Sequence, residues 1–123
     1  MALRVLIVDD DRSFLDAARA LLERQGLDVV GVASASAEVL RQAAEPHPDV
    51  VLVDLRLGAE SGFDLARLMA EDERLGRSAV ILISTHAEAD FAELIAESPA
   101  IGFVPKSELS ADAIRRILDG RPR

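Results

Sequence analysis

The stretch LIVDDD (residues 6–11) runs an apolar segment directly into three consecutive carboxylates. Two like charges about 4 Å apart repel each other by roughly 4 kcal/mol at an effective dielectric near 20, so another group must offset this repulsion. The apolar run that precedes the acids, LRVLIV (residues 3–8), is nearly continuous, which is typical of a strand buried on both faces of a parallel sheet. The stretch therefore predicts a buried strand whose carboxyl end carries a charged site.

Short β-branched runs alternate with amphipathic helical patterns along the whole chain. Strands are expected at residues 3–8, 28–33, 50–53, 79–83 and 101–104. A first helix is expected between its cap, Asp11 or Ser13, and its stop at Gly26. Further helices are expected at residues 36–44, 63–73, 88–97 and 109–119.

In the helix expected at residues 88–97, Phe91, Leu94 and Ile95 are predicted to point inward. Five successive strand–helix units with short connections demand right-handed crossovers and helices on both faces of one parallel sheet. We therefore expect an α/β doubly wound fold in which residues 1–123 form one domain.

Composition excludes several classes of function. The chain of 123 residues has no Cys, which rules out disulfides and thiolate chemistry, and its net charge of −8 argues against direct binding of nucleic acid by this domain. No signal peptide is visible, and no apolar stretch approaches the roughly 18 residues of a membrane span. A cytoplasmic protein without a membrane segment is the expectation.

Chemistry-bearing residues follow four of the five expected strands. These residues are Asp9 and Asp10, Asp54, Ser84, and Lys106, the only Lys beside thirteen Arg. Sites in doubly wound sheets form at the carboxyl ends of the strands, next to the point where the strand order reverses. If the order is 2-1-3-4-5, the four strand ends are neighbours, and their side chains should meet.

Clustered carboxylates without His or Cys ligands suit a hard divalent cation such as Mg²⁺, which prefers oxygen ligands and usually keeps several waters. A phosphoryl group can then be held between the metal, an ammonium and a hydroxyl. The segment GAESG (residues 58–62) lacks the Lys of a phosphate-binding loop. The site is therefore suited to one phosphoryl group rather than to a nucleotide.

With these residues at its strand ends, the chain resembles the receiver domain of two-component response regulators over essentially its whole length. The matching stretches are VLIVDDD, DVVLVDLRLGAESGFDL, AVILIST and GFVPKSEL (residues 5–11, 49–65, 79–85 and 102–109). The resemblance implies a flavodoxin-like (βα)₅ three-layer sandwich with a five-stranded parallel sheet of order 2-1-3-4-5. It also implies a phosphoacceptor whose only activities are Mg²⁺-dependent autophosphorylation and autodephosphorylation, not an enzyme in the usual sense.

Carried over by position, the resemblance makes Asp54 the phosphoacceptor, Lys106 the partner of one phosphoryl oxygen and Ser84 the hydrogen-bond donor to another. Ser84 and the aromatic Phe103 would form the switch. For Mg²⁺, the resemblance implies the carboxylates of Asp10 and Asp54 and the backbone carbonyl of Arg56 as direct ligands, and Asp9 as a ligand through water. His86, two residues beyond Ser84, is expected as a surface residue at the rim rather than as a catalytic residue; the alternative is that it orders or obstructs the hydrolytic water.

The implied partners are a sensor histidine kinase or a phosphotransfer protein as phosphoryl donor. The signal would leave through the surface formed by residues 88–97, 101–104 and 109–119, which would contact a partner or a second copy in a homodimer. GFVPKSELS (residues 102–110) also resembles receivers that precede helix-turn-helix output domains, so a C-terminal DNA-binding domain outside this chain is a further expectation.

Two other interpretations stay open. A receiver-like module that is never phosphorylated would act only in docking or dimerisation, although the intact acid set argues against it. A haloacid-dehalogenase-type phosphohydrolase would use Asp9 as nucleophile, because Asp9-x-Asp11-x-Ser13 loosely fits its first motif. The chain lacks that family's cap and its downstream Gly-Asp-x-x-x-Asp motif.

Overall fold

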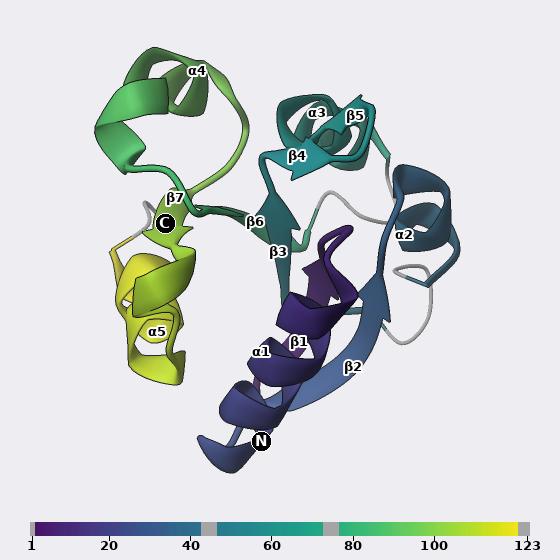
Figure 1. Cartoon of the computed structure of the whole chain (residues 1–123), viewed down its shortest axis with the longest axis vertical. Coiled ribbons are helices and arrows are strands. Elements are labelled where there is room, and N and C mark those ends of the chain that lie inside the picture. The colour runs from purple at the N-terminus through teal and green to yellow at the C-terminus, as the bar shows by residue number, and fades with distance from the viewer. Residues whose placement is uncertain (1, 43–46, 73–76, 121–123) are drawn as a thin grey trace.

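The computed structural model describes residues 2–42, 47–72 and 77–120 of the chain. A five-stranded parallel sheet of order β2-β1-β3-β6-β7 forms its centre (Figure 1). The strands of this sheet are β1 (Arg4–Val8), β2 (Asp28–Ala33), β3 (Val50–Asp54), β6 (Ala79–Ser84) and β7 (Gly102–Pro105). The helices are α1 (Arg12–Arg24), α2 (Ser36–Gln42), α3 (Gly62–Glu71), α4 (Ala92–Glu97) and α5 (Ala111–Asp119), with 3₁₀ turns η1 (Glu88–Phe91) and η2 (Lys106–Glu108). The expected strand order is confirmed.

The apolar runs of the central strands send alternate side chains to opposite faces, as the two-residue period of a strand requires. In β1, Val5 and Ile7 join one buried cluster, whereas Leu6 and Val8 join the other. β3 and β6 divide their side chains in the same way. Both faces of these strands are therefore buried, which explains why their sequences show almost no polar alternation.

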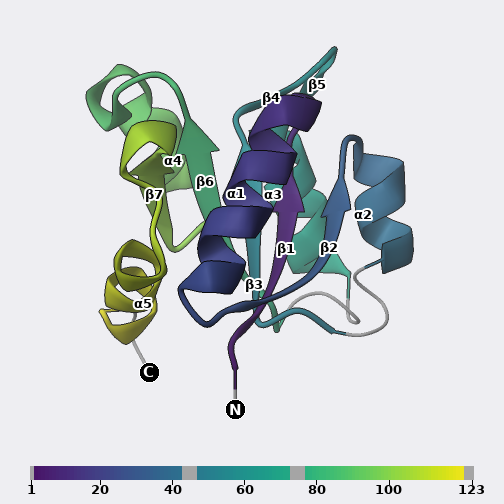
Figure 2. The same ribbon diagram turned by 60° about the horizontal axis from the view of Figure 1, so that its bottom comes forward.

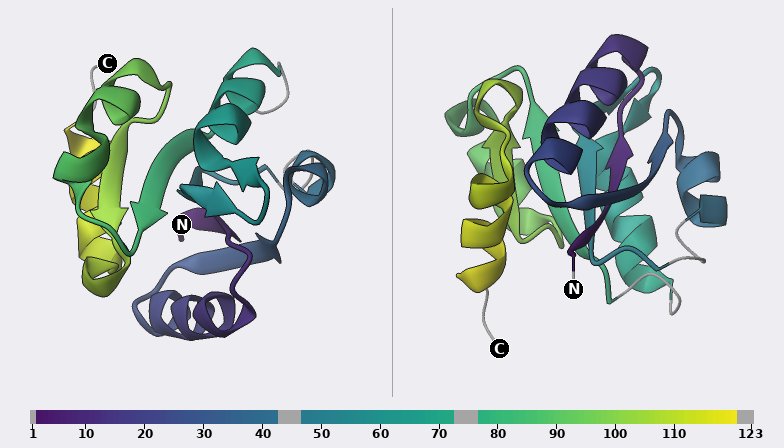
Figure 3. Two further views of the ribbon diagram at one scale, coloured as in Figure 1. Left: turned by 45° about the horizontal axis from the view of Figure 1, so that its top comes forward. Right: turned by 90° about the horizontal axis from the view of Figure 1, so that it is seen from below.

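The helices cover the two faces of the sheet unequally. The cluster that contains Val5 and Ile7 also contains buried side chains of α1 and α5. The cluster that contains Leu6 and Val8 contains buried side chains of α2 and α3 and partly buried residues of η1 and α4. Figures 2 and 3 show α1 on one side of the sheet and α3 on the other. The result is the expected three-layer sandwich. Within the described residues, no helix has the length and apolar content needed to cross a bilayer.

Helix α1 begins and ends as its sequence predicts. Asp11 is the N-cap: its carboxylate accepts hydrogen bonds from the backbone N–H groups of Ser13 and Phe14, at 3.0 and 3.3 Å. The alternative cap, Ser13, is wrong. After the helix, Gly26 has φ +92°, a left-handed conformation that side chains with a Cβ rarely adopt.

The helix before β7 and an additional ribbon depart from the sequence prediction. The helix expected at residues 88–97 is a 3₁₀ turn followed by the short helix α4, and Leu94 is 46% exposed rather than inward. The tighter 3₁₀ turn changes the angular phase of the residues that follow it. A two-stranded antiparallel ribbon, β4 (Arg56–Leu57) with β5 (Glu60–Ser61), was not expected. The predicted helix ends at residues 43–44 and 73 lie outside the described residues.

Candidate functional site

The register of the sheet brings four strand ends together. Val8 of β1 lies beside Val53 of β3, so the acids that follow β1 are next to Asp54, the last residue of β3. On the other side of β3, Asp54 is level with Ile83, one residue before Ser84. Ser84 in turn is level with Pro105, which directly precedes Lys106. The predicted neighbourhood of these side chains is therefore a consequence of strand order and register.

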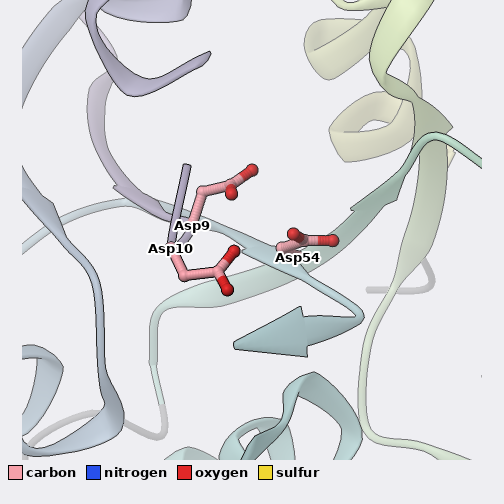
Figure 4. A group of neighbouring side chains, drawn as sticks. All are labelled: Asp9, Asp10 and Asp54. Atoms are coloured by element: carbon pink, nitrogen blue, oxygen red, sulfur yellow. The ribbon is translucent and has the colours of Figure 1, made fainter. Parts of the chain in front are cut away.

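Three carboxylates converge at this edge of the sheet. Asp9, Asp10 and Asp54 each offer one oxygen atom, and these atoms lie within 4.8 Å of one another (Figure 4). Asp9 is fully buried and Asp54 is 8% exposed, whereas Asp10 faces solvent. The site therefore has a fully buried inner acid, a nearly buried acid at the margin and an exposed outer acid.

The ammonium of Lys106 lies between the two buried acids. Its Nζ is 2.6 Å from Asp9 Oδ2 in an ion pair and donates a hydrogen bond of 3.3 Å to Asp54 Oδ2. Both contacts are sheltered, because the Lys106 side chain is only 13% exposed. One cation is thus shared by two anions, and it is closer to Asp9.

The pKa of Asp54 is perturbed by its surroundings. Burial, and after it the charge of Asp9, raise the pKa of Asp54 to about 6 against the opposing effect of Lys106. Burial disfavours the charged form of Lys106, but its contacts with Asp9 and Asp54 outweigh that effect and raise the pKa of the amine. The site is therefore short of positive charge, and a cation would relieve the repulsion that LIVDDD implies.

A pocket of about 210 Å³ opens beside Asp54. Its lining residues include Arg56, Ser84, Thr85, His86 and Lys106. The Oγ of Ser84 accepts a hydrogen bond of 3.0 Å from the backbone N–H of His86, and the His86 ring nitrogen Nδ1 lies 3.5 Å from the same oxygen. The His86 ring also packs edge-on against Phe91. His86 is thus at the rim, as expected, and it contacts Ser84.

The β4–β5 ribbon forms one wall of the site. Asp10 Oδ2 accepts a hydrogen bond of 2.8 Å from the backbone N–H of Gly58, and the N–H of Arg56 approaches Asp54 Oδ1 at 3.5 Å. Metal binding by the Arg56 carbonyl stays a prediction. Phe103 is buried in the cluster that faces α3, and its switch role likewise stays a prediction.

Gly62, at the start of α3, permits the close return of the ribbon to Asp54. A Cβ at this position would lie 2.1 Å from the backbone oxygen of Asp54, a separation that forces the backbone to shift. We expect Gly62→Ala to lower the free energy of unfolding by about 2 kcal/mol in urea titrations.

Gly120→Ala is the matched control for this prediction, because its added Cβ would meet nothing closer than 3.4 Å. Its effect should stay within about 0.5 kcal/mol. Equal effects of the two substitutions would show that the approach of Gly62 to Asp54 is not a constraint on the fold.

Sequence reasoning missed two contacts around the site. The Lys106 ammonium lies over the ring of Phe14, 4.4 Å from its centroid. On the ribbon, the Glu60 carboxylate accepts hydrogen bonds from the backbone N–H and the hydroxyl of Ser36, at the start of α2, which hold the pKa of Glu60 below its usual value. No local motif signals either contact. The solitary status of Lys106 was the only hint that its surroundings are specialised.

Comparison with known proteins agrees with this geometry. Residues 5–119 match the family described as response regulator receiver domain. The chain is 30% identical over 125 residues to the transcriptional regulatory protein LiaR of Bacillus subtilis, an alignment that covers 98% of this chain and 58% of LiaR. It is 29% identical over 106 residues to the polar-differentiation response regulator DivK of Brucella ovis, covering 86% of this chain and 85% of DivK.

Solved structures give the same result. A two-component response regulator of the LuxR family from Aurantimonas superposes with a TM-score of 0.85 at 31% identity, covering 98% of this chain and 88% of that one. The signal receiver domain of NarL from Mycobacterium tuberculosis gives a TM-score of 0.80 at 28% identity, with 98% of each chain covered. Among the curated relatives, the chain spans 58% of LiaR and 50% of a relative from Pseudomonas aeruginosa.

Proposed function

The chain belongs to the family of response regulator receiver domains, which signal through phosphorylation, and we propose that Asp54 is the residue that accepts the phosphoryl group. The donor is a sensor histidine kinase or a phosphotransfer protein, and residues 1–123 act as one receiver domain. The observation that carries this proposal is the convergence of Asp9, Asp10, Asp54 and Lys106 at one edge of the sheet.

The reaction needs a nucleophile and stabilisation of negative charge. An oxygen of the Asp54 carboxylate attacks phosphorus, a new P–O bond forms, and the bond from phosphorus to the donor breaks. With a histidine donor the electron pair of that bond returns to the imidazole nitrogen. With acetyl phosphate the pair stays on the carboxylate oxygen, and acetate leaves. Lys106, which already contacts Asp54, pairs with a phosphoryl oxygen, and Ser84, which lines the same pocket, donates a hydrogen bond to another.

The donor set fits Mg²⁺. Asp10 and Asp54 would bind it through their carboxylates, Arg56 through its backbone carbonyl, and Asp9 through water. All these donors are oxygen atoms, and the described residues place no His or Cys in the acid cluster. When bound, the ion supplies positive charge that neutralises the acids and the incoming phosphoryl oxygens. The raised pKa of Asp54 supports this need for a cation.

The output requires an element with two conformations that the phosphoryl group biases. Ser84 moves toward the phosphoryl group and draws in the segment that leads to η1 and α4, and Phe103 changes rotamer with it. The face formed by α4, β7 and α5 then contacts a partner, a second copy, or a DNA-binding output domain. Its exposed charged residues include Glu93, Glu97, Arg115 and Arg116.

The phosphohydrolase interpretation is less compatible with the burial of Asp9. A nucleophile must reach its substrate, whereas Asp9 is fully buried and ion-paired with Lys106. Asp54 instead borders the pocket of about 210 Å³. No observation in the described residues favours a docking module that is never phosphorylated over a phosphoacceptor.

Intact-protein mass spectrometry after incubation with acetyl phosphate and Mg²⁺ tests the proposal. We expect a mass gain of one phosphoryl group that needs Mg²⁺ and that hydroxylamine removes, because an acyl phosphate is labile to this nucleophile. Protein incubated with acetyl phosphate and EDTA is the control, and it should gain little mass. If the protein gained no mass in the presence of Mg²⁺, the result would contradict the proposal and support the docking module.

A further inference from the structure

The Lys106 ammonium has an aromatic neighbour in addition to its two carboxylates. Its Nζ lies over the Phe14 ring, 4.4 Å from the centroid, within the range of a cation–π interaction. An ammonium has three N–H donors, and Asp9 and Asp54 take two directions. The negative face of the ring occupies a further side of the charge.

The fold brings Phe14 to this place through the cap of α1. The Asp11 carboxylate accepts a hydrogen bond from the Phe14 N–H and so fixes the first turn of the helix. Phe14 is partly buried and packs against the core cluster that contains Leu15 and Val104. Helix α1 therefore delivers an aromatic ring to the end of β7, where Lys106 begins η2.

A long Lys side chain needs such support. Its stem has many rotamers, and holding the ammonium at one point costs conformational entropy. The attraction to Asp9 alone would favour the inner position, away from Asp54, because the Asp9 contact is already the shorter one. A ring on another side of the ammonium restricts the directions in which Nζ can move and excludes water from that side.

We propose that Phe14 is a positioning residue that holds the Lys106 ammonium between Asp9 and Asp54 through a cation–π contact. In so far as it concerns phosphorylation, this inference rests on the proposed function. Phe14 does not touch the phosphoryl group and acts only through Lys106. Loss of the aromatic face should slow phosphorylation by roughly tenfold, in line with a partly buried cation–π contact.

Because Lys106 is the only Lys in the chain, protein labelled with ¹³C-lysine gives a single ε-methylene signal in NMR. In the wild type we expect this signal to be displaced upfield by the ring current of Phe14. Phe14→Leu keeps an apolar side chain but removes the ring, so the signal should return to the ordinary lysine position. Phe14→Tyr keeps the ring and should retain the displacement.

The second measurement is the rate of phosphorylation by acetyl phosphate in Mg²⁺. Phe14→Leu should be roughly tenfold slower and Phe14→Tyr close to wild type, because Tyr keeps the aromatic face. Tyr also keeps the volume of Phe, so the displaced lysine signal, which volume alone does not produce, is the readout that identifies the ring. An unchanged rate in Phe14→Leu, or the same lysine signal in wild type and Phe14→Leu, would overturn the inference.

Different outcomes of the two measurements refute the proposed function and the role of Phe14. A wild type that takes no phosphoryl group refutes the proposed function, whereas the lysine signal still decides whether Phe14 holds the ammonium. A wild type that is phosphorylated but shows no ring-current displacement refutes only the role of Phe14.

Discussion

Asp54→Asn should lose the labile phosphoryl group completely, with a rate of phosphorylation lower by roughly 10³-fold or more. The substitution keeps the size and shape of the side chain but replaces the attacking carboxylate oxygen by a much weaker nucleophile. Lys106 and the pocket beside residue 54 remain in place. Intact-protein mass spectrometry with acetyl phosphate and Mg²⁺ measures the loss.

Asp11→Asn is the matched control for this prediction. Asp11 belongs to the same acidic run, but it caps α1 and is not among the three acids whose oxygens converge. Asn is an equally good cap, so this variant should fold and take up the phosphoryl group as the wild type does. If Asp54→Asn still gained a phosphoryl group and only Asp9→Asn failed to gain one, the result would instead support the phosphohydrolase.

The same Asp54→Asn substitution should stabilise the metal-free protein at neutral pH. The folded-state pKa of Asp54 is about 6, above the ordinary value of 3.8, because burial and Asp9 disfavour its charge. A carboxyl group with a raised pKa gives its full stabilisation below about 3.8 and loses it as the pH rises through about 6. At pH 7.5 and above, the charged Asp54 therefore costs on the order of 3 kcal/mol relative to its neutral form.

Urea unfolding in EDTA at a series of pH values measures this effect. Asn is neutral throughout, so the variant and the wild type should have similar unfolding free energies near pH 4 and diverge between pH 4 and 7. A difference that is constant with pH, or a wild type that is the more stable protein at pH 7.5, would contradict the account of strained charge at Asp54.

Much of this site follows from sequence because strand order and side-chain period are set by residue pattern. The acids after β1, Asp54 after β3 and Lys106 after β7 meet because parallel strands share one carboxyl edge. Period-two burial in continuous apolar runs follows from the same rule. These features depend on local pattern and on topology, both of which a sequence carries.

Other features depend on packing between distant segments. The Phe14–Lys106 contact joins residues far apart in the chain, and the Asp10–Gly58 hydrogen bond depends on how the β4–β5 ribbon closes. The ribbon strands have two residues each, which is too short for a periodic signal. Leu94 was placed inward because an unbroken helix was assumed, whereas the 3₁₀ turn before α4 alters its direction.

Locating the phosphoryl group on the chain tests the central claim most directly. Borohydride reduces an acyl phosphate to an alcohol, so a phosphorylated aspartate becomes homoserine, which peptide mass spectrometry identifies at a single position. After incubation with acetyl phosphate and Mg²⁺, homoserine is expected at position 54 and nowhere else. Homoserine at position 9, or a phosphorylated protein in which residue 54 is still aspartate after reduction, would contradict the claim.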